Sequence, residues 1–387
     1  MSGMIFLLLL TTQFSWQVID TMPNPRWGGR AVPLEEGVLL IGGEDETGPS
    51  DAVELFRIQD RSWQELCSLP YPLRDFAVVS FNGQIYVLGG RTALDSASSA
   101  VLIYSLEGDS FSIAPFELPR KMYGMEAQLV GEKVYLFGGI VDSVYLPRGY
   151  VIDLNDFSVD SFDLNVERSY FGSALYCGIP DTSVYLLGGL WYDYLSSVEK
   201  FDPGEQTWSG YDELPEPRAY HVSMIYGNTL MVIGGEIDGQ VTSSVLRSPF
   251  NEPWYPATPM FYARADLMGT LLGDSIFVFG GYTYDNSQKV SVPYVEKYSL
   301  CIEVNEPVET VGGSLPVRAP NPIGRGDLIV VSAPVLIELY SPEGRLVRSL
   351  MVDSPFRFDE LGLKAGVYLA LVRSGQTERI TKWLYLP

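Results

Sequence analysis

The sequence predicts an all-β protein in which six similar four-stranded sheets form a closed ring, followed by a smaller β domain. The first observation behind this prediction is a repeated pattern of four apolar residues and Gly-Gly, whose first glycines are 46 to 50 residues apart. A fixed period of this length, filled with short strand patterns, is typical of repeat architectures. The second observation is a change in charge, from a net −24 over residues 1–314 to +2 over residues 315–387, which favours two domains. The glycine pairs begin at Gly42, Gly89, Gly138, Gly188, Gly234 and Gly280.

Each repeat contains the signals of four strands. An apolar segment is followed by a tight turn such as Asn82–Gly83, and then by the apolar run that ends in Gly-Gly. Turn dipeptides between apolar runs predict β-hairpins. A polar loop and another short strand, such as Val198–Phe201, come next, and an aromatic residue marks the fourth strand. The aromatic residues are Trp16, Trp63, Phe111, Phe157, Trp208 and Trp254.

The order of these parts predicts how the ring closes. An aromatic strand precedes the first Gly-Gly, and the last repeat ends near Leu300 without one. We therefore expect Trp16–Asp20 to form the outer strand of the sixth sheet, so that residues 16–310 leave no open radial edge. The glycines and aromatic residues have structural explanations, because Gly tolerates positive φ where a strand turns and large rings fill the space between sheets.

These residues resemble the kelch repeat, in which Gly-Gly ends the second strand and a Trp lies on the fourth. The match covers roughly residues 16 to 300 in six copies, with Phe in place of Trp in the third copy and no third-strand aromatic at Val245–Arg247 in the fifth. The resemblance implies a six-bladed kelch-type β-propeller. It is specific for the fold and does not identify a ligand.

A basic residue follows each aromatic residue by about ten positions. Recurrence in every repeat favours a structural role, in which the side chain caps carbonyl groups or pairs with carboxylates. The alternative is a ring of cations that binds an anionic ligand such as a sialic acid. The six residues are Arg26, Arg74, Lys121, Arg168, Arg218 and Arg264.

The loops after each Gly-Gly and before each inner strand share one face of a propeller, and here they are rich in aromatic residues and carboxylates. Such a face suits stacking on sugars and also suits a protein interface. The alternative is that the loop tyrosines pack on neighbouring loops. The predicted binding residues of this face and the adjoining channel are Trp191, Tyr192, Tyr194, Arg218, Tyr220, His221, Arg264, Tyr282 and Tyr284.

The composition favours a binding module for a glycan or a protein rather than an enzyme. His221 is the single histidine, which excludes sites built on several histidines, and no catalytic, metal or cofactor motif is present. The alternative is a carbohydrate isomerase or mutarotase of the sialic-acid class, which requires a convergent Arg–Glu–His cluster in a deep pocket. A net charge of −22 argues against nucleic acid and anionic membranes as partners.

The last segment differs from the repeats. Residues 311–314 predict a linker, and residues 315–387 show the alternating strands of a small Ig-like sandwich. This segment resembles the type A sorting domain of bacterial type IX secretion substrates, which implies export by that machinery to the medium or the outer cell surface. A generic Ig-like accessory domain is the alternative. The matching residues are Pro320, Asn321, Pro322, Gly344, Arg345, Gly366, Tyr368 and Lys382.

The N-terminus agrees with export. Met4–Leu10 is an apolar run of suitable length, so residues 1–15 are expected to form a signal peptide that leads to the periplasm. No segment reaches the ~20 apolar residues of a transmembrane helix. Cys67, Cys177 and Cys301 do not suggest a disulfide framework, and we expect all three to be buried. We expect a monomer.

Overall fold

A computed structural model of the chain describes residues 11–178, 182–250 and 252–303, and the strands between residues 317 and 386. The chain divides into two compact units, one of Trp16–Ser299 and one that combines Met1–Ser15 with Leu300–Pro387. Strands are the only regular elements of these residues, and none of them forms a helix that could span a membrane.

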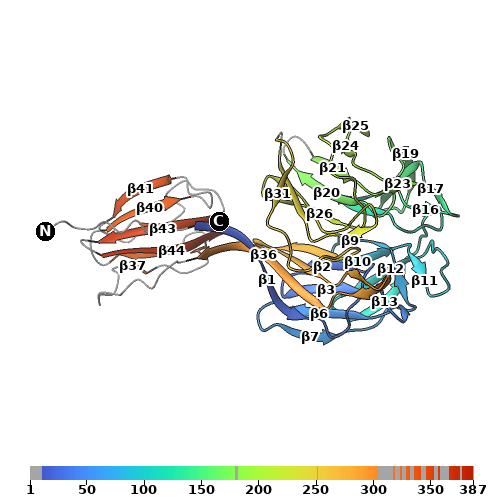
Figure 1. Cartoon of the computed structure of the whole chain (residues 1–387), viewed down its shortest axis with the longest axis horizontal. Helices are drawn as coiled ribbons and strands as arrows, with labels where there is room; N and C mark the ends of the chain where they lie inside the picture. The colour runs from blue at the N-terminus through green and yellow to red at the C-terminus, as the bar shows by residue number, and fades with distance from the viewer. Residues whose placement is uncertain are drawn as a thin grey trace. The chain divides into compact units, whose positions relative to one another are not determined.

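Residues 16–299 form six four-stranded antiparallel sheets, which we call blades 1 to 6 (Figure 1). This confirms the predicted six-bladed propeller. From the inner to the outer strand, blade 1 contains β2 (Arg30–Leu34), β3 (Gly37–Ile41), β6 (Val53–Arg57) and β7 (Ser62–Glu65). Blade 2 contains β9 (Ala77–Phe81), β10 (Gln84–Leu88), β12 (Val101–Ser105) and β13 (Ser110–Ile113). Blade 3 contains β14 (Glu126–Val130), β15 (Lys133–Phe137), β18 (Arg148–Asp153) and β19 (Val159–Asp163). Blade 4 contains β20 (Gly172–Cys177), β21 (Thr182–Leu187), β24 (Val198–Asp202) and β25 (Thr207–Gly210), and blade 5 contains β26 (Val222–Tyr226), β27 (Thr229–Ile233), β30 (Val245–Pro249) and β31 (Tyr255–Ala257).

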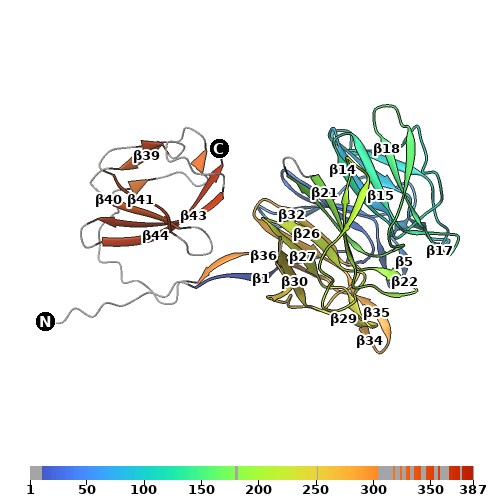
Figure 2. The ribbon, with the colours of Figure 1, turned by 90° about the horizontal axis from the view of Figure 1, so that it is seen from above.

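Blade 6 joins the two ends of the propeller. Its strands, from inside to outside, are β32 (Met268–Leu272), β33 (Ser275–Phe279), β36 (Tyr294–Glu303) and β1 (Thr11–Thr21). Figure 2 shows β1 and β36 side by side. The ring of Trp16 on β1 lies 5.1 Å from that of Tyr298 on β36, and its Nε1 donates a hydrogen bond of 2.9 Å to the carbonyl oxygen of Thr258. The first strand of the propeller is therefore held by the last blade.

The hydrophobic core lies between neighbouring blades. The second strand of each blade is covered on both faces, which explains why its sequence is a continuous apolar run rather than an alternating one. Between blades 6 and 1, Phe279 packs against Phe56 with ring centroids 5.6 Å apart. Between blades 3 and 4, Phe137 packs against Phe201 at 5.4 Å. Aromatic side chains thus fill the wedge-shaped gaps that open between sheets away from the axis.

A ring of six backbone hydrogen bonds surrounds the axis. In each blade one N–H group donates to the carbonyl oxygen of the equivalent residue in the preceding blade, at 2.7 to 2.9 Å. All six residues have positive φ, between 50° and 67°, a conformation that Gly adopts freely and other residues adopt at a cost. We call this set the axial ring; its members are Gly28, Asp75, Gly124, Tyr170, Tyr220 and Asp266.

A buried ion pair recurs two residues before the axial ring. In blade 4 the Arg168 guanidinium is fully buried, donates to the carbonyl of Gly188 at 2.8 Å and contacts Glu199 at 2.5 Å. Blades 1 and 6 repeat the arrangement with Arg26–Glu54 and Arg264–Glu296. The recurrent arginines thus cap the carbonyl of the first glycine, the structural role that their recurrence favoured.

In blades 2, 3 and 5, other residues occupy one or both positions of this ion pair. The two equivalent positions hold Leu73 and Leu102 in blade 2, and Met122 and Tyr150 in blade 3. In blade 5 the position of the glutamate holds Leu246, and Arg218 donates to the Ser244 hydroxyl at 3.2 Å and lies 3.6 Å from the Glu216 carboxylate. The prediction that Arg74 and Lys121 belong to the recurrent series is therefore wrong. The carbonyls of Leu73 and Met122 accept hydrogen bonds from Gly43 and Gly90, as Arg168 does from Gly139.

Two further expectations need correction. Phe157 lies before the outer strand of blade 3 with φ of 60° and stacks on Phe116, while Val159 pairs with Ile152 at the position expected to be aromatic. The expectation that the cysteines are buried is wrong for Cys67 and Cys177, which are exposed thiols. Cys67 follows the outer strand of blade 1, and Cys177 is the last residue of the inner strand of blade 4.

The C-terminal unit contains a three-stranded sheet, β37-β39-β42, and a five-stranded sheet, β38-β44-β43-β40-β41. Ile337 and Leu339 are fully buried on one face of β40. The predicted sorting residues Gly366 and Tyr368 lie on β43, and Lys382 pairs with Leu369 from β44. The remaining sorting residues (Pro320, Asn321, Pro322, Gly344 and Arg345), residues 1–10 and the linker 311–314 lie outside the described residues. The strands are β37 (Val317–Arg318), β38 (Ile323–Gly324), β39 (Leu328–Val331), β40 (Val335–Tyr340), β41 (Leu346–Val352), β42 (Phe356–Arg357), β43 (Gly366–Ser374) and β44 (Thr377–Leu386).

The repeats contain their own control for the buried ion pair. Arg168→Leu leaves the Glu199 carboxylate buried without its cation, and we expect a loss of about 3–5 kcal/mol in the free energy of unfolding. The double variant Arg168→Leu/Glu199→Leu reproduces the Leu73–Leu102 pair of blade 2, so most of the loss should be recovered. Chemical denaturation measures both, with exposed Arg148→Leu as the control. Equal losses for the single and double variants would contradict the account.

Candidate binding face and axial cavity

Short two-stranded elements follow the glycine pairs and lie on one face of the propeller, which we call the hairpin face. In each case backbone bridges join the segment after Gly-Gly to the segment before the inner strand, as at Trp27–Glu44 and Tyr123–Ile140. The two sets of loops therefore meet in each of these blades, as expected. The elements are β4 (Glu44–Asp45) with β5 (Gly48–Pro49), β8 (Leu73–Arg74) with β11 (Arg91–Thr92), β16 (Ile140–Val141) with β17 (Val144–Tyr145), β22 (Leu190–Trp191) with β23 (Asp193–Tyr194), β28 (Glu236–Ile237) with β29 (Gln240–Val241), and β34 (Tyr282–Asp285) with β35 (Gln288–Ser291).

Two neighbouring hairpins expose a group of apolar side chains. Tyr192 is 81% exposed, Val144 57% and Trp191 43%. The ring of Tyr145 lies 5.2 Å from that of Tyr192, and Trp191 donates to the Glu167 carboxylate at 2.8 Å. We call Val144, Tyr145, Trp191 and Tyr192 the aromatic patch. Trp191 and Tyr192, both predicted as binding residues, are thus available to a partner.

Three of the other four predicted tyrosines already have hydrogen-bonded hydroxyl groups. The buried Glu236 carboxylate accepts three hydroxyl groups, from Tyr194 at 2.8 Å, Tyr282 at 2.8 Å and Tyr284 at 3.0 Å. Tyr282 is itself fully buried, so its prediction as a ligand contact is corrected. Three blades are tied together at one carboxylate from blade 5, which supports the alternative that loop tyrosines pack on neighbouring loops.

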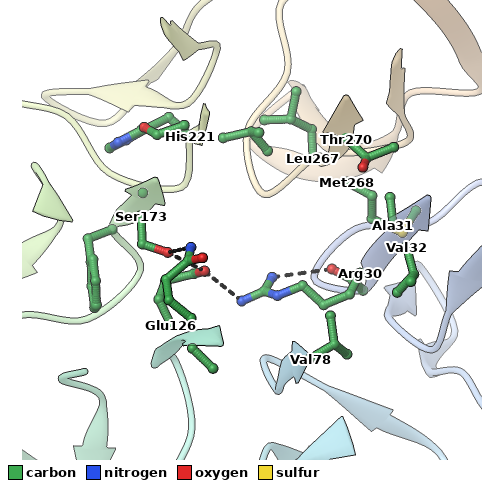
Figure 3. A pocket seen from close by; sticks show the side chains of 18 of the residues that line it. Arg30, Ala31, Val32, Val78, Glu126, Ser173, His221, Leu267, Met268 and Thr270 are labelled. Carbon is green, nitrogen blue, oxygen red and sulfur yellow. Dashed lines mark hydrogen bonds and ion pairs between the residues drawn. The ribbon is translucent and has the colours of Figure 1, made fainter. Parts of the chain in front are cut away.

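A cavity of about 420 Å³ lies on the propeller axis. Figure 3 shows Arg30 of blade 1 reaching toward Glu126 of blade 3, with 2.9 Å between the Nη2 and Oε1 atoms. Glu126 also accepts from Ser173 at 3.2 Å, and Gln128 donates to the Ser173 hydroxyl at 2.8 Å. This network joins three inner strands across the cavity. Burial raises the pKa of Glu126, and Arg30 and Ser173 oppose that shift.

His221 lines the same cavity but is packed against the neighbouring blade. Its Nε2 lies 2.8 Å from the position that a Cβ atom on Gly172 would take, and neither ring nitrogen has a hydrogen-bond partner among the described residues. Burial, with the Arg218 charge, lowers the His221 pKa to about 3. A neutral imidazole without a carboxylate partner is a poor general acid. Arg30, Glu126 and His221 share a cavity, yet no hydrogen bond joins His221 to the other two in the described chain.

Arg218 and Arg264 are not available to a ligand. Both guanidinium groups are fully buried in the blades and donate to the carbonyls of Gly234 and Gly280. Their prediction as binding residues is therefore corrected to a structural role. Tyr220, by contrast, is half-buried in the axial ring and lines the cavity.

Two carboxylates lie beside the axial ring at one end of the cavity. An Asp266 oxygen and an Asp75 oxygen lie 3.0 Å and 3.3 Å from the position that a Cβ on Gly28 would take. Asp75 pairs with Arg74 at 2.7 Å, whereas no ion pair or hydrogen bond of the Asp266 carboxylate occurs among the described side chains. Burial and the neighbouring Asp75 raise the pKa of Asp266 to about 7. Burial likewise raises the pKa of Asp75.

The sequence reasoning missed Asp75 and Asp266, although a signal was present. Five axial-ring residues precede the first glycine of their pair by 14 positions, and Tyr170 precedes it by 18 because the β20–β21 turn is longer. Aligning the repeats by this distance, rather than by residue type, would have placed both aspartates beside Tyr170 and Tyr220. In the described part of the chain, no group of three His, Cys, Asp or Glu side chains is arranged to hold a metal ion.

The raised pKa predicts how stability depends on pH. The Asp266 carboxyl ionises near its usual value of 3.8 in the unfolded chain but near 7 in the fold, so its ionisation should reduce the free energy of unfolding as pH rises from about 4 to about 7. Asp266→Asn removes this effect. Between about pH 4 and pH 7 the free energy of unfolding should therefore decrease less in the variant than in the parent chain, by roughly 1–3 kcal/mol. Urea denaturation at several pH values measures the difference. The exposed control Asp285→Asn should have the pH profile of the parent chain. Identical profiles for the parent chain and Asp266→Asn would contradict the assignment.

Comparison with known proteins supports the architecture. The family model described as the KLHDC2/KLHL20/DRC7 Kelch-repeats domain matches residues 75–281. Kelch-like protein 25 of Xenopus tropicalis is 24% identical over 268 residues, which cover 65% of this chain and 44% of that protein. Kelch-like protein terF of Aspergillus terreus is 23% identical over 292 residues, covering 68% and 62%.

A third relative belongs to a differently named group. The host cell factor homolog hcf-1 of Caenorhabditis elegans is 26% identical over 265 residues, covering 57% of this chain and 33% of that protein. The chain spans less than two thirds of the length of each of these three relatives.

Proposed function

The chain belongs to the kelch-repeat family, and from this premise we propose that it is a non-enzymatic protein-binding module whose partner contacts the aromatic patch. The observation that carries the proposal is the exposure of Tyr192 and Trp191 on a hairpin that projects from blade 4. Aromatic side chains exposed in this way are costly to solvate and are enriched at interface hot spots.

The backbone at the patch supports a role in binding. Tyr192 has φ of 58°, and a bulky residue in the left-handed region costs about 1–3 kcal/mol. Asp193 turns the hairpin tightly by accepting the backbone N–H of Tyr194 at 2.8 Å. The strained turn holds the Tyr192 ring outward, where it contributes little to the core. This backbone conformation destabilises the fold and leaves an aromatic ring exposed, which suits recognition of a partner better than packing of the core.

Selection from a peptide library tests this proposal. Full-length protein is immobilised, and each peptide that binds it is then titrated against the double variant Trp191→Ala/Tyr192→Ala. We expect saturable binding that falls at least about tenfold in the double variant, as removal of a hot spot predicts. The matched control is Tyr255→Ala, an exposed tyrosine on the outer strand β31. Peptides that bind the double variant equally well would reject the patch.

A glycan array tested in parallel decides between the two ligand classes. Loop aromatics also suit sugar stacking, so glycan binding that depends on Trp191, with no peptide selected, would replace the protein proposal with a glycan one. A mutarotase activity would instead require the cavity, and would be lost in Glu126→Gln while the patch variants remained active.

We propose in addition that residues 315–387 direct export through the type IX machinery, to the medium or the outer surface. The support is the series of motif residues noted above and the separation of this unit from the propeller. In a bacterium with a functional type IX system, the full chain should reach the medium or the surface, and a chain ending at residue 314 should remain in the periplasm. Equal export of both chains would reject the proposal.

A further inference from the structure

Aromatic rings from five blades form an almost continuous arc around the axis on the hairpin face. The ring centroids are separated by 6.5 Å from Tyr123 to Tyr170, 4.6 Å from Tyr170 to Tyr220, and 6.4 Å from Tyr220 to Tyr282. Trp27 completes the arc at 5.8 Å from Tyr282. We call these five residues the aromatic collar. Blade 2, which lacks an aromatic residue here, contributes Arg74 and Asp75 instead.

Two members of the collar border the carboxylates of the axial cavity. Tyr170, Tyr220, Asp75 and Asp266 all line this cavity, and the Tyr170 hydroxyl lies 3.3 Å from an Asp75 oxygen. The Asp266 carboxylate is half-buried and has no ion pair or hydrogen bond among the described side chains. A carboxylate left in this position is poorly hydrated and is stabilised by a cation.

The collar already accepts cations at two of its rings. The Lys289 Nζ atom lies 3.7 Å from the centroid of Tyr282, and the Arg91 guanidinium lies 4.6 Å from that of Tyr123. Between them lies the close pair of Tyr170 and Tyr220. Among the described residues, the one cation over either ring is Lys289, at 5.9 Å from the centroid of Tyr220. The centre of the collar, beside Asp266, thus combines aromatic rings and an unpaired carboxylate, the two groups that bind organic cations.

We propose that the centre of the aromatic collar is a binding site for an ammonium group, supplied by a lysine side chain of a protein or by a free amine. The proposal goes beyond the aromatic patch and does not depend on it. Asp75 and Asp266 repel an anionic ligand, and two of the nearby cations are already paired: Arg74 with Glu44, Asp75 and Asp95, and Arg91 with Asp95. A cavity of about 420 Å³ is large enough for an alkylammonium chain.

Binding should depend on pH, because a cation favours the ionised form of Asp266. The groups that face this carboxylate are Asp75, which opposes its ionisation, and Arg30, Arg74 and Lys289, which favour it. The Tyr220 and Tyr282 hydroxyls remain protonated near neutral pH, because burial raises their pKa. Affinity should therefore rise as pH increases through about 7, and bound ammonium should shift the titration of Asp266 to lower pH.

The experiment is a titration of the full chain with N-acetyl-lysine amide and with butylammonium, followed by NMR of the labelled tyrosines. Uncharged N-acetyl-norleucine amide is the control ligand. We expect saturable shifts with the two cations and none with norleucine; a response to butylammonium alone would identify free amines as the source. Asp266→Asn, which keeps the side-chain shape, should weaken binding at least tenfold, and Asp285→Asn on the exposed hairpin should not.

Two further variants make the outcome decisive. Lys289→Leu removes the resident ammonium group and should strengthen binding severalfold. Trp191→Ala/Tyr192→Ala should leave cation affinity unchanged, so a failure of the aromatic patch is distinguishable from a failure of the collar. Equal binding of lysine and norleucine amides, or unchanged affinity in a folded Asp266→Asn protein, would overturn the proposal.

Discussion

The axial ring of backbone hydrogen bonds is the constraint on which the rest of the propeller depends. It requires one residue per blade with positive φ and one donor directed at the preceding blade, and it is satisfied six times. Each bond replaces water on backbone groups that would otherwise be buried unpaired near the axis. Because the ring fixes where every inner strand starts, it also fixes which side chains surround the axis. Asp75, Tyr170, Tyr220 and Asp266 meet there because of their place in the repeat.

Next to this ring, the two positions that hold a buried ion pair in some blades hold different residues in others. The carbonyl of the first glycine is capped by a buried arginine in four blades, and three of these arginines have a buried glutamate. In blade 2 the same two positions hold Leu73 and Leu102, which belong to one hydrophobic cluster, so the fold also accommodates an apolar pair there. A buried ion pair is therefore one solution among several rather than a requirement of the fold, in keeping with its small net contribution to stability.

The architecture could be predicted from the sequence because its signals are periodic: the glycine pairs, the hairpin turns and the outer aromatic residues recur at nearly constant distance. The candidate site could be predicted only in part. Trp191 and Tyr192 follow from their loop position, but the burial of Tyr282 depends on Glu236 of another blade. Asp266 carries no motif, and its raised pKa arises from burial and from Asp75, a neighbour nearly two hundred residues away in the chain. Such properties depend on contacts between repeats, which periodicity within one repeat does not reveal.

The most direct test of the account is amide hydrogen exchange, measured by NMR on the full chain, at the six residues of the axial ring. If the ring is closed, all six amides should exchange as slowly as those in the buried second strands, and the Gly28 amide, which donates to Asp266 across the junction of the first and last blades, should exchange no faster than that of Tyr170. Exchange of the Gly28 amide at the rate of an exposed turn such as Gly83 would show an open ring. That result would contradict both the closure of the propeller and the arrangement of the axial site.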